Sequence, residues 1–295
     1  MRKTHRAMRS RRPGTRLHSV PDKPRERDLT AAVACLNLGP RPGAVEHNLR
    51  VAEQEIRQTK TANPDLAWVV LPELYTSGYS GLATIHEHAE YADAGVSLWH
   101  FTALARELGI YIAYGFPERL PDGGICTSAN LIGPGDRTPL LTYRKMNLVR
   151  TTLEWRVFTP GTELPVMTIG GHTVALLICW DLGHPETVRE AAARGADLVL
   201  APAAWRDPWS RQYDLSCAAR ALDNAVHVAS ANQLGSYPEA DFGAIGSLYG
   251  PDGASLSEGP DRTRIAPLDP TLPLRWRNTY GSTLQQEFAS LEEAL

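Results

Sequence analysis

The sequence predicts an α/β fold built in layers, because short apolar segments alternate with amphipathic helical segments along most of the chain. A chain of 295 residues with 43% hydrophobic side chains can bury most of its apolar surface in one large domain. Neither a repeat of about 20 to 50 residues nor a Pro/Ser-rich linker divides it. We therefore expect one domain over residues 29–295, with a tail from about residue 260.

The individual elements are predicted from the spacing of apolar side chains. Residues 31–37 form a continuous apolar run typical of a buried strand, and apolar side chains then recur from Val45 to Ile56 at helical spacing. After Pro260 the sequence is weakly patterned, and we expect it to wrap the surface or a partner subunit. In chain order, strands are predicted over 31–37, 66–71, 110–115, both sides of the turn at 133–136, 172–180, 196–203 and 225–232, and helices over 45–56, 98–108, 186–194 and 213–222.

Charge is distributed unevenly along the chain. Residues 1–28 hold ten of the 30 basic residues and three acidic ones, whereas residues 29–295 carry a net charge of −10. The first 28 residues cannot bury enough apolar area to offset their ordering entropy. We expect them to form a disordered basic leader, either solvated or bound to an anionic partner. The acidic body would repel phosphate backbones, which argues against a nucleic-acid partner.

The composition also limits the compartment and the cofactors. No run of eighteen apolar residues is present, so we expect no membrane partner. The leader lacks the apolar stretch of a secretory signal, and we expect a cytoplasmic protein. The four cysteines are scattered, with no CxxC pair or close Cys/His cluster, so we expect no disulfide framework, no metal and no cofactor.

Three reactive side chains fall where predicted strands end, which is where α/β folds commonly place ligands. Glu73 follows the strand over 66–71, Lys145 ends the LLTYRK stretch, and Cys179 ends VALLIC. A carboxylate, an ammonium and a thiol are the groups needed for acyl transfer through a thioester.

Each of these residues also has a purely structural interpretation. Glu73 could cap a loop, and Lys145 is distinguished only as one of four lysines beside 26 arginines. Cys179 differs from an ordinary core cysteine because WDLGHPE follows it, which predicts a sharp strand-to-helix turn braced by Asp181, with backbone amides facing a bound oxygen. We assign the other cysteines to the core: Cys35, Cys126 and Cys217.

Taken together, these segments resemble the nitrilase superfamily of carbon–nitrogen hydrolases over residues 30–255. The resemblance rests on LPELYTSGY around Glu73, YRKMNL around Lys145, EWRVFTPG from Glu154, and ICWDLGHPETVREAAARGADLVLAPAAW around Cys179. The stretches RALDNAVHVASAN and GSLYGPDG also look like later segments of the family. Three ordered motifs at family-like spacing are a far more specific signal than one short pattern.

The resemblance implies a four-layer αββα sandwich and a catalytic triad of Glu73, Lys145 and Cys179. It also implies a second glutamate, Glu154, that positions the substrate or Lys145, and a homodimer or larger homo-oligomer. One position departs from the family, because Asn147 stands where members commonly have His. The Asn147 side chain can still donate and accept hydrogen bonds, but unlike His it cannot gain or lose a proton near neutral pH. The segment between Lys145 and Glu154 is short, and we expect it to shape one wall of the site.

From this triad we expect a hydrolase that cleaves a non-peptide C–N bond of a small molecule, an amide or N-carbamoyl bond, through a thioester on Cys179. The oxyanion of the addition step would be stabilised by Lys145 and the backbone N–H of Trp180. Asn147, Phe158, Trp180 and Trp205 are candidate oxyanion- or substrate-binding residues, although aromatic residues beside strands commonly belong to the core.

Other functions remain open at this stage. A true nitrilase would use the same residues, although the ICWD stretch looks closer to the amidase and carbamoylase branches. An N-acyltransferase would pass the acyl group of the thioester to an amine instead of water. A catalytically silent binding or scaffold protein is disfavoured because it has no chemical reason to keep the four polar residues together.

Deletion of residues 1–28 is expected to leave hydrolase activity nearly unchanged, because the leader contributes no site residue. The measurement is ammonia release from an amide by the truncated and full-length proteins, with circular dichroism as a control for folding. A truncated protein that does not fold would contradict the leader assignment.

Overall fold

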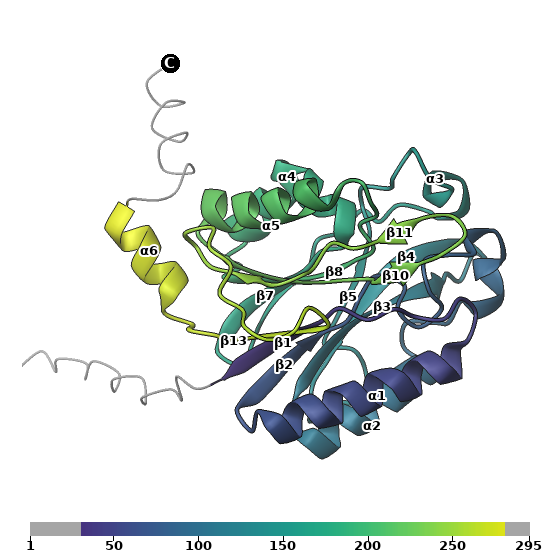
Figure 1. Cartoon of the computed structure of the whole chain (residues 1–295), viewed down its shortest axis with the longest axis horizontal. Helices are drawn as coiled ribbons and strands as arrows, with labels where there is room; N and C mark the ends of the chain where they lie inside the picture. Colours follow the sequence, from purple (N-terminus) through teal and green to yellow (C-terminus); the bar gives the residue numbers. More distant parts are fainter. Residues whose placement is uncertain (1–30, 281–295) are drawn as a thin grey trace, which may run out of the picture.

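The computed structural model describes residues 31–280, in which two β-sheets pack face to face and helices cover both outer faces (Figure 1). The layers follow the order α, β, β, α, which confirms the expected four-layer sandwich. The leader expected at 1–28 and the end of the tail, residues 281–295, lie outside the described residues.

The first sheet is parallel at its centre and antiparallel at both sides. Strands β1, β2 and β3 run parallel, while β4 and β5 on one side and β13 on the other are antiparallel to their neighbours. In spatial order the strands are β13 (Thr263–Pro267), β1 (Ala32–Leu36), β2 (Leu66–Val70), β3 (Tyr111–Arg119), β4 (Ile125–Ile132) and β5 (Leu141–Arg144).

The second sheet has the same plan, with three parallel central strands and an antiparallel strand at each edge. In spatial order its strands are β12 (Leu248–Tyr249), β9 (His227–Asn232), β8 (Leu198–Ala203), β7 (His172–Leu176) and β6 (Val166–Ile169). A separate two-stranded ribbon joins β10 (Gly235–Ser236) to β11 (Asp241–Phe242).

Two long helices cover each outer face. The apolar stripe predicted for the first helix is confirmed, since Leu49, Ala52 and Ile56 are buried against the first sheet. The helices α1 (Val45–Ala62) and α2 (Val96–Leu108) pack on that sheet, and α4 (Pro185–Ala193) and α5 (Ser210–Asn224) pack on the second (Figure 1). The shorter helices are η1 (Leu82–His88), α3 (Glu154–Val157), η2 (Cys179–Gly183) and α6 (Leu272–Tyr280).

Apolar side chains from both sheets fill the space between them. Val33 and Trp68 of the first sheet and Val174 and Leu198 of the second belong to one buried cluster. Strands β1, β8 and β9 are buried along their whole length, because each lies between a second sheet and a layer of helices. This two-sided burial explains why the strands appear in the sequence as continuous apolar runs rather than as alternating patterns.

Several segments differ from the sequence-based prediction, and two of them bear on the site and on the sheet edge. The strand expected over 172–180 ends at Leu176, because the Ile178 backbone N–H donates to the Asp181 carboxylate at 3.0 Å and the chain turns into η2. The weakly patterned segment after Pro260 contains β13, which pairs antiparallel with β1 at the sheet edge.

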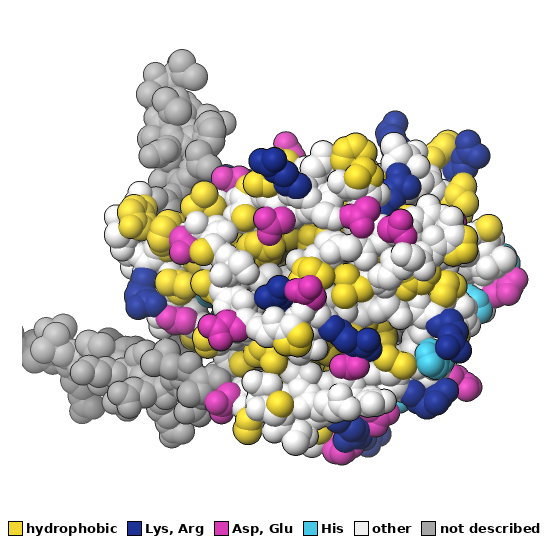
Figure 2. Space-filling view, viewed as in Figure 1, with side chains coloured by type: hydrophobic (Ala, Val, Ile, Leu, Met, Phe, Trp, Pro, Cys, Tyr) yellow, Lys and Arg dark blue, Asp and Glu magenta, His cyan; other side chains and the backbone are white. Residues whose placement is uncertain are grey.

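The surface mixes charges of both signs. Figure 2 shows acidic and basic side chains interspersed on one face of the molecule, with no continuous basic field of the kind that a phosphate backbone needs. Within residues 31–280, every helix is too short or too polar to cross a membrane.

Gly115 of β3 allows the loop that carries Glu73 to pass close to the first sheet. A Cβ atom at position 115 would lie 2.5 Å from the backbone nitrogen of Leu74 and 2.8 Å from Cα of Glu73. Backbone atoms cannot swing aside as a flexible side chain can, so this close approach requires glycine.

A Gly115→Ala variant should therefore unfold at lower urea concentration, with a loss of about 1–3 kcal/mol typical of overpacking. The matched control is Gly135→Ala, in an exposed turn where an added Cβ meets nothing within 4 Å. Urea denaturation followed by fluorescence measures both variants. Equal stability of the two variants would show that the loop is not held against the sheet.

Candidate active site

The polar residues singled out in the sequence meet in one cluster to which both sheets contribute. Glu73 follows β2, Lys145 follows β5, Glu154 opens α3, and Cys179 opens η2 after β7. The side chains of Glu73, Lys145 and Glu154 have no exposed area. Lys145 Nζ lies 2.7 Å from Oε1 of Glu73 and 2.9 and 3.0 Å from the two carboxylate oxygens of Glu154. The three donors of the ammonium therefore all face carboxylate oxygens.

Glu154 is held from several directions. Besides the two bonds from Lys145, it accepts a hydrogen bond from the Tyr79 hydroxyl at 2.6 Å and one from the Val149 backbone N–H at 2.8 Å. A carboxylate with four donors around it is fixed in place, which suits it to hold Lys145. Sequence analysis did not single out Tyr79, although it lies six residues after Glu73 in the quoted LPELYTSGY stretch.

Cys179 lies at the sharp turn that its flanking sequence predicts. Its backbone φ is 48°, in the left-handed region that residues with a Cβ rarely adopt. Such a conformation costs on the order of 1–3 kcal/mol and persists only where the surroundings enforce it. The enforcing group is Asp181, which accepts hydrogen bonds from the Ile178 backbone N–H at 3.0 Å and from the Tyr143 hydroxyl at 2.9 Å. Asp181 therefore braces the turn, as expected.

Asn147 connects this turn to the segment that carries Lys145. Its backbone N–H and its side-chain amide both donate to Asp181 Oδ1, at 3.0 and 2.9 Å, and the amide also donates to the Thr187 hydroxyl at 3.0 Å. One carboxylate thus ties the turn at Cys179 to residues on both sides of Lys145, namely Tyr143 and Asn147. Hydrogen bonding at position 147 is retained with Asn in place of His.

Burial dominates the electrostatics of the cluster. It raises the pKa of Glu73 to about 7, against the opposing charge of Lys145. Burial and the nearby charge of Glu73 also raise the pKa of the Cys179 thiol well above its usual value, and together they outweigh the charge of Lys145, which acts to lower it. Burial acts to lower the pKa of Lys145, but the carboxylates of Glu154 and Glu73 outweigh it and raise that pKa well above its usual range. The resting site therefore holds a neutral thiol, a charged ammonium and a carboxyl group that titrates near neutral pH.

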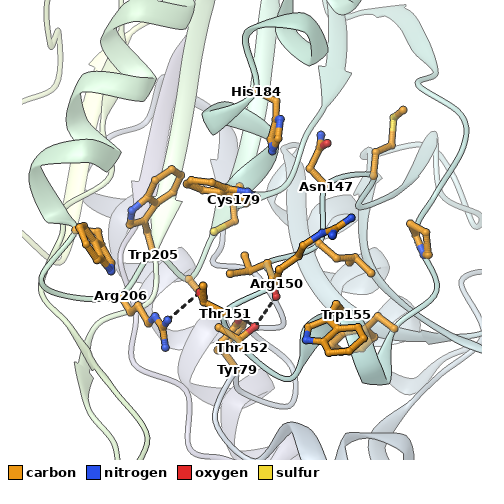
Figure 3. A pocket seen from close by; sticks show the side chains of 18 of the residues that line it. Tyr79, Asn147, Arg150, Thr151, Thr152, Trp155, Cys179, His184, Trp205 and Arg206 are labelled. Atoms are coloured by element: carbon orange, nitrogen blue, oxygen red, sulfur yellow. Dashed lines mark hydrogen bonds between the residues drawn. The ribbon is translucent and has the colours of Figure 1, made fainter.

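A cavity of about 1190 Å³ opens onto Cys179 (Figure 3). The four residues predicted for the pocket all line it, and the segment between Lys145 and Glu154 forms one wall, as expected. The Trp180 and Trp205 rings lie against each other with centroids 5.1 Å apart. The predicted wall residues are Asn147, Phe158, Trp180 and Trp205, and those that sequence analysis missed include Tyr79, Arg150, Trp155, His184, Arg206 and Trp209.

The missed wall residues lie on loops or in the short helix α3, next to the recognised motifs. Trp155 is part of the quoted EWRVFTPG stretch, and Arg206 directly follows Trp205. Their proximity to a motif was the available signal, but an exposed arginine or tryptophan on a loop carries no local pattern that separates it from ordinary surface. Within residues 31–280, no group of three or more His, Cys, Asp or Glu side chains is arranged to hold a metal ion.

The chain belongs to the carbon–nitrogen hydrolase family, whose profile matches residues 32–277. This match covers both sheets and every element that contributes to the cluster, and the relatives of the chain include enzymes named as amidases, formamidases and nitrilases. The protein is therefore a carbon–nitrogen hydrolase of the nitrilase superfamily.

Three relatives illustrate the range of activities after which similar proteins are named. A protein of Pseudomonas protegens named "Hydrolase in pqqF 5′ region" is 35% identical, over 77% of this chain and 78% of its own. The (R)-stereoselective amidase of a Pseudomonas species is 30% identical, over 79% and 82%. The nitrilase of Pyrococcus abyssi is 29% identical, over 80% and 89%.

A solved structure is similar over nearly the whole chain. It is a glutamate-to-glutamine mutant of the amidase from Nesterenkonia sp. AN1, with the acetamide moiety of fluoroacetamide added covalently at its active-site cysteine. It is 28% identical, covers 90% of this chain and 98% of its own, and has a TM-score of 0.72.

Iodoacetamide should alkylate Cys179 at a rate that rises as the pH passes through about 7, because Glu73 must lose its proton before it can accept one from the thiol. A Glu73→Gln variant should lose this rise and react roughly 10²-fold more slowly, as for removal of a general base. The control Cys126→Ser should keep the wild-type profile. Mass spectrometry of the intact protein and its peptides follows the reaction, and an inflection at the pH of an ordinary free thiol would contradict the assigned role of Glu73.

Proposed function

We propose that the protein is an amidase-type hydrolase that cleaves an amide or N-carbamoyl bond of a small molecule through a thioester on Cys179. The observation that carries this proposal is the position of a buried Glu73–Lys145 ion pair beside a thiol that lines a large cavity. A nucleophile, a proton acceptor and a cation are the parts that acyl transfer needs. The amidase relative and the covalently modified amidase structure support the same assignment.

The first half-reaction forms the thioester. The Cys179 sulfur bonds to the amide carbonyl carbon while its proton passes to the Glu73 carboxylate. The resulting oxyanion is stabilised by the Lys145 ammonium and by the backbone N–H of Trp180, which lies in the first turn of η2 where N–H groups have no helical acceptor. The C–N bond then breaks, and Glu73 returns its proton to the leaving nitrogen, which departs as ammonia or an amine.

The second half-reaction hydrolyses the thioester. Glu73, again a carboxylate, takes a proton from a water molecule whose oxygen bonds to the thioester carbon. The C–S bond breaks, the proton returns to the Cys179 sulfur, and the acid product leaves. Glu154 takes no proton in this scheme, because its oxygens already accept hydrogen bonds from Lys145 and Tyr79. Its role is to hold the ammonium in place.

Two alternative activities use the same thioester. A nitrilase would add Cys179 to a nitrile, and an N-acyltransferase would pass the acyl group to an amine. The amide assignment is favoured by the relative named as an amidase and by the amidase structure with a covalent adduct at its cysteine. A catalytically silent protein is disfavoured because a buried ammonium between two carboxylates is costly to keep for structure alone.

A homodimer and a cytoplasmic location remain parts of the proposal. Apolar residues of α5 support the dimer, since Leu215 and Leu222 are 54% and 46% exposed on a helix that covers the second sheet. Exposed apolar residues on one helix mark a candidate contact with a second copy.

The decisive experiment mixes the protein with a panel of amides and N-carbamoyl compounds and measures ammonia release together with the intact protein mass. We expect ammonia from at least one substrate and a mass increase equal to its acyl group. A Cys179→Ala variant should show neither, whereas Cys126→Ser should show both. Turnover of nitriles without turnover of amides would refute the amidase assignment, and acyl transfer to an added amine in place of hydrolysis would favour the acyltransferase.

A further inference from the structure

The cavity wall is rich in aromatic side chains. Four of the seven tryptophans in the chain line it, together with a tyrosine and a phenylalanine. Trp155 and Trp209 keep 50% and 48% of their area exposed, although both lie on a concave surface. Exposed apolar area in a concave site marks the place where a ligand packs, and flat aromatic faces suit a planar apolar group. The aromatic lining residues are Tyr79, Trp155, Phe158, Trp180, Trp205 and Trp209.

The charges in this wall have one sign. Arg150 and Arg206 line the cavity and no Asp or Glu does, although residues 29–295 contain 30 acidic and only 20 basic residues. Within residues 31–280, neither arginine forms an ion pair with a carboxylate. The wall therefore presents cations that the protein itself leaves without an anion.

The two arginines come from different loops that are tied together. Arg206, after β8, donates to the Thr151 hydroxyl at 3.1 Å, and Thr151 is the neighbour of Arg150 in the segment before α3 (Figure 3). Both guanidinium groups line the cavity, but they extend toward opposite sides of it, Arg206 beside Thr151 and Arg150 toward Asn147 (Figure 3). They do not serve to neutralise Glu73 or Glu154, because these buried carboxylates are already bonded to Lys145.

We propose that the cavity selects amides that carry a planar apolar body and, at its far end, an anionic group such as a carboxylate. This inference rests on the proposed amidase function. The scissile amide lies at Cys179, the planar body packs against the tryptophans, and the anion is bound by Arg150 or by Arg206. A guanidinium presents paired donors that match a carboxylate. A small neutral amide would leave most of the cavity empty.

Two probes of nearly equal shape test this selectivity: 4-carboxyphenylacetamide and the neutral 4-nitrophenylacetamide, whose planar nitro group has the size of a carboxylate. Their dissociation constants are measured by calorimetry on the full-length Cys179→Ala protein, and their kcat/KM values on the wild type. We expect the carboxylate probe to be preferred about tenfold in both measurements, the effect of one charge-assisted hydrogen-bonded contact. The preference should fall to about one in a double variant, Arg150→Gln with Arg206→Gln. It should be unchanged in Arg137→Gln, which removes the same charge from an exposed turn between β4 and β5.

The binding and turnover measurements separate the two proposals. Equal binding of the two probes, a preference that survives the double variant, or no binding of either probe would overturn the selectivity. Turnover of both probes at equal rates would also overturn the selectivity, but it would support the proposed amidase function. Selective binding to Cys179→Ala, without ammonia release or acylation in the wild type, would support the anion site and refute the proposed reaction.

Discussion

A buried ammonium is the constraint on which the site depends. Lys145 has no exposed area, and a cation in that position is tolerable only when acceptors surround it. Glu73 and Glu154 supply those acceptors from positions 72 and 9 residues away in the chain. Any displacement of the end of β5 from either glutamate would leave a charge without a partner. The ion cluster therefore constrains the positions of the loops that carry these three residues, as close packing constrains side chains in a core.

The same burial divides the site into two parts with different tasks. In the interior, burial raises the pKa of Glu73 to about 7 against the opposing charge of Lys145, which suits this carboxyl group to the proton transfers that we propose. In the wall, Arg150 and Arg206 have no carboxylate within the described residues to pair with, so their charges are available to a ligand. The interior charges thus form ion pairs with each other, whereas the two arginines of the wall can pair with an anionic ligand.

Most of the layered fold was predictable from local patterns. The strands over 66–71 and 196–203 and the first long helix were found because two-sided burial produces apolar runs and one-sided burial produces a helical stripe. The edge strands β6 and β13 were not found. Their side chains are mostly half-buried or exposed, so their pairing with β7 and β1 leaves little trace in the apolar pattern.

The sequence by itself determined the α/β class, the carboxylate, ammonium and thiol at strand ends, and the turn after Cys179, since each is written in a few consecutive residues. Only the tertiary structure decided that Lys145 donates to both glutamates, that Tyr79 joins them, and that a cationic, aromatic wall faces the thiol. The reason is physical: periodicity and turn chemistry act between near neighbours. Burial, pKa values and the lining of a cavity depend instead on groups brought together from distant segments.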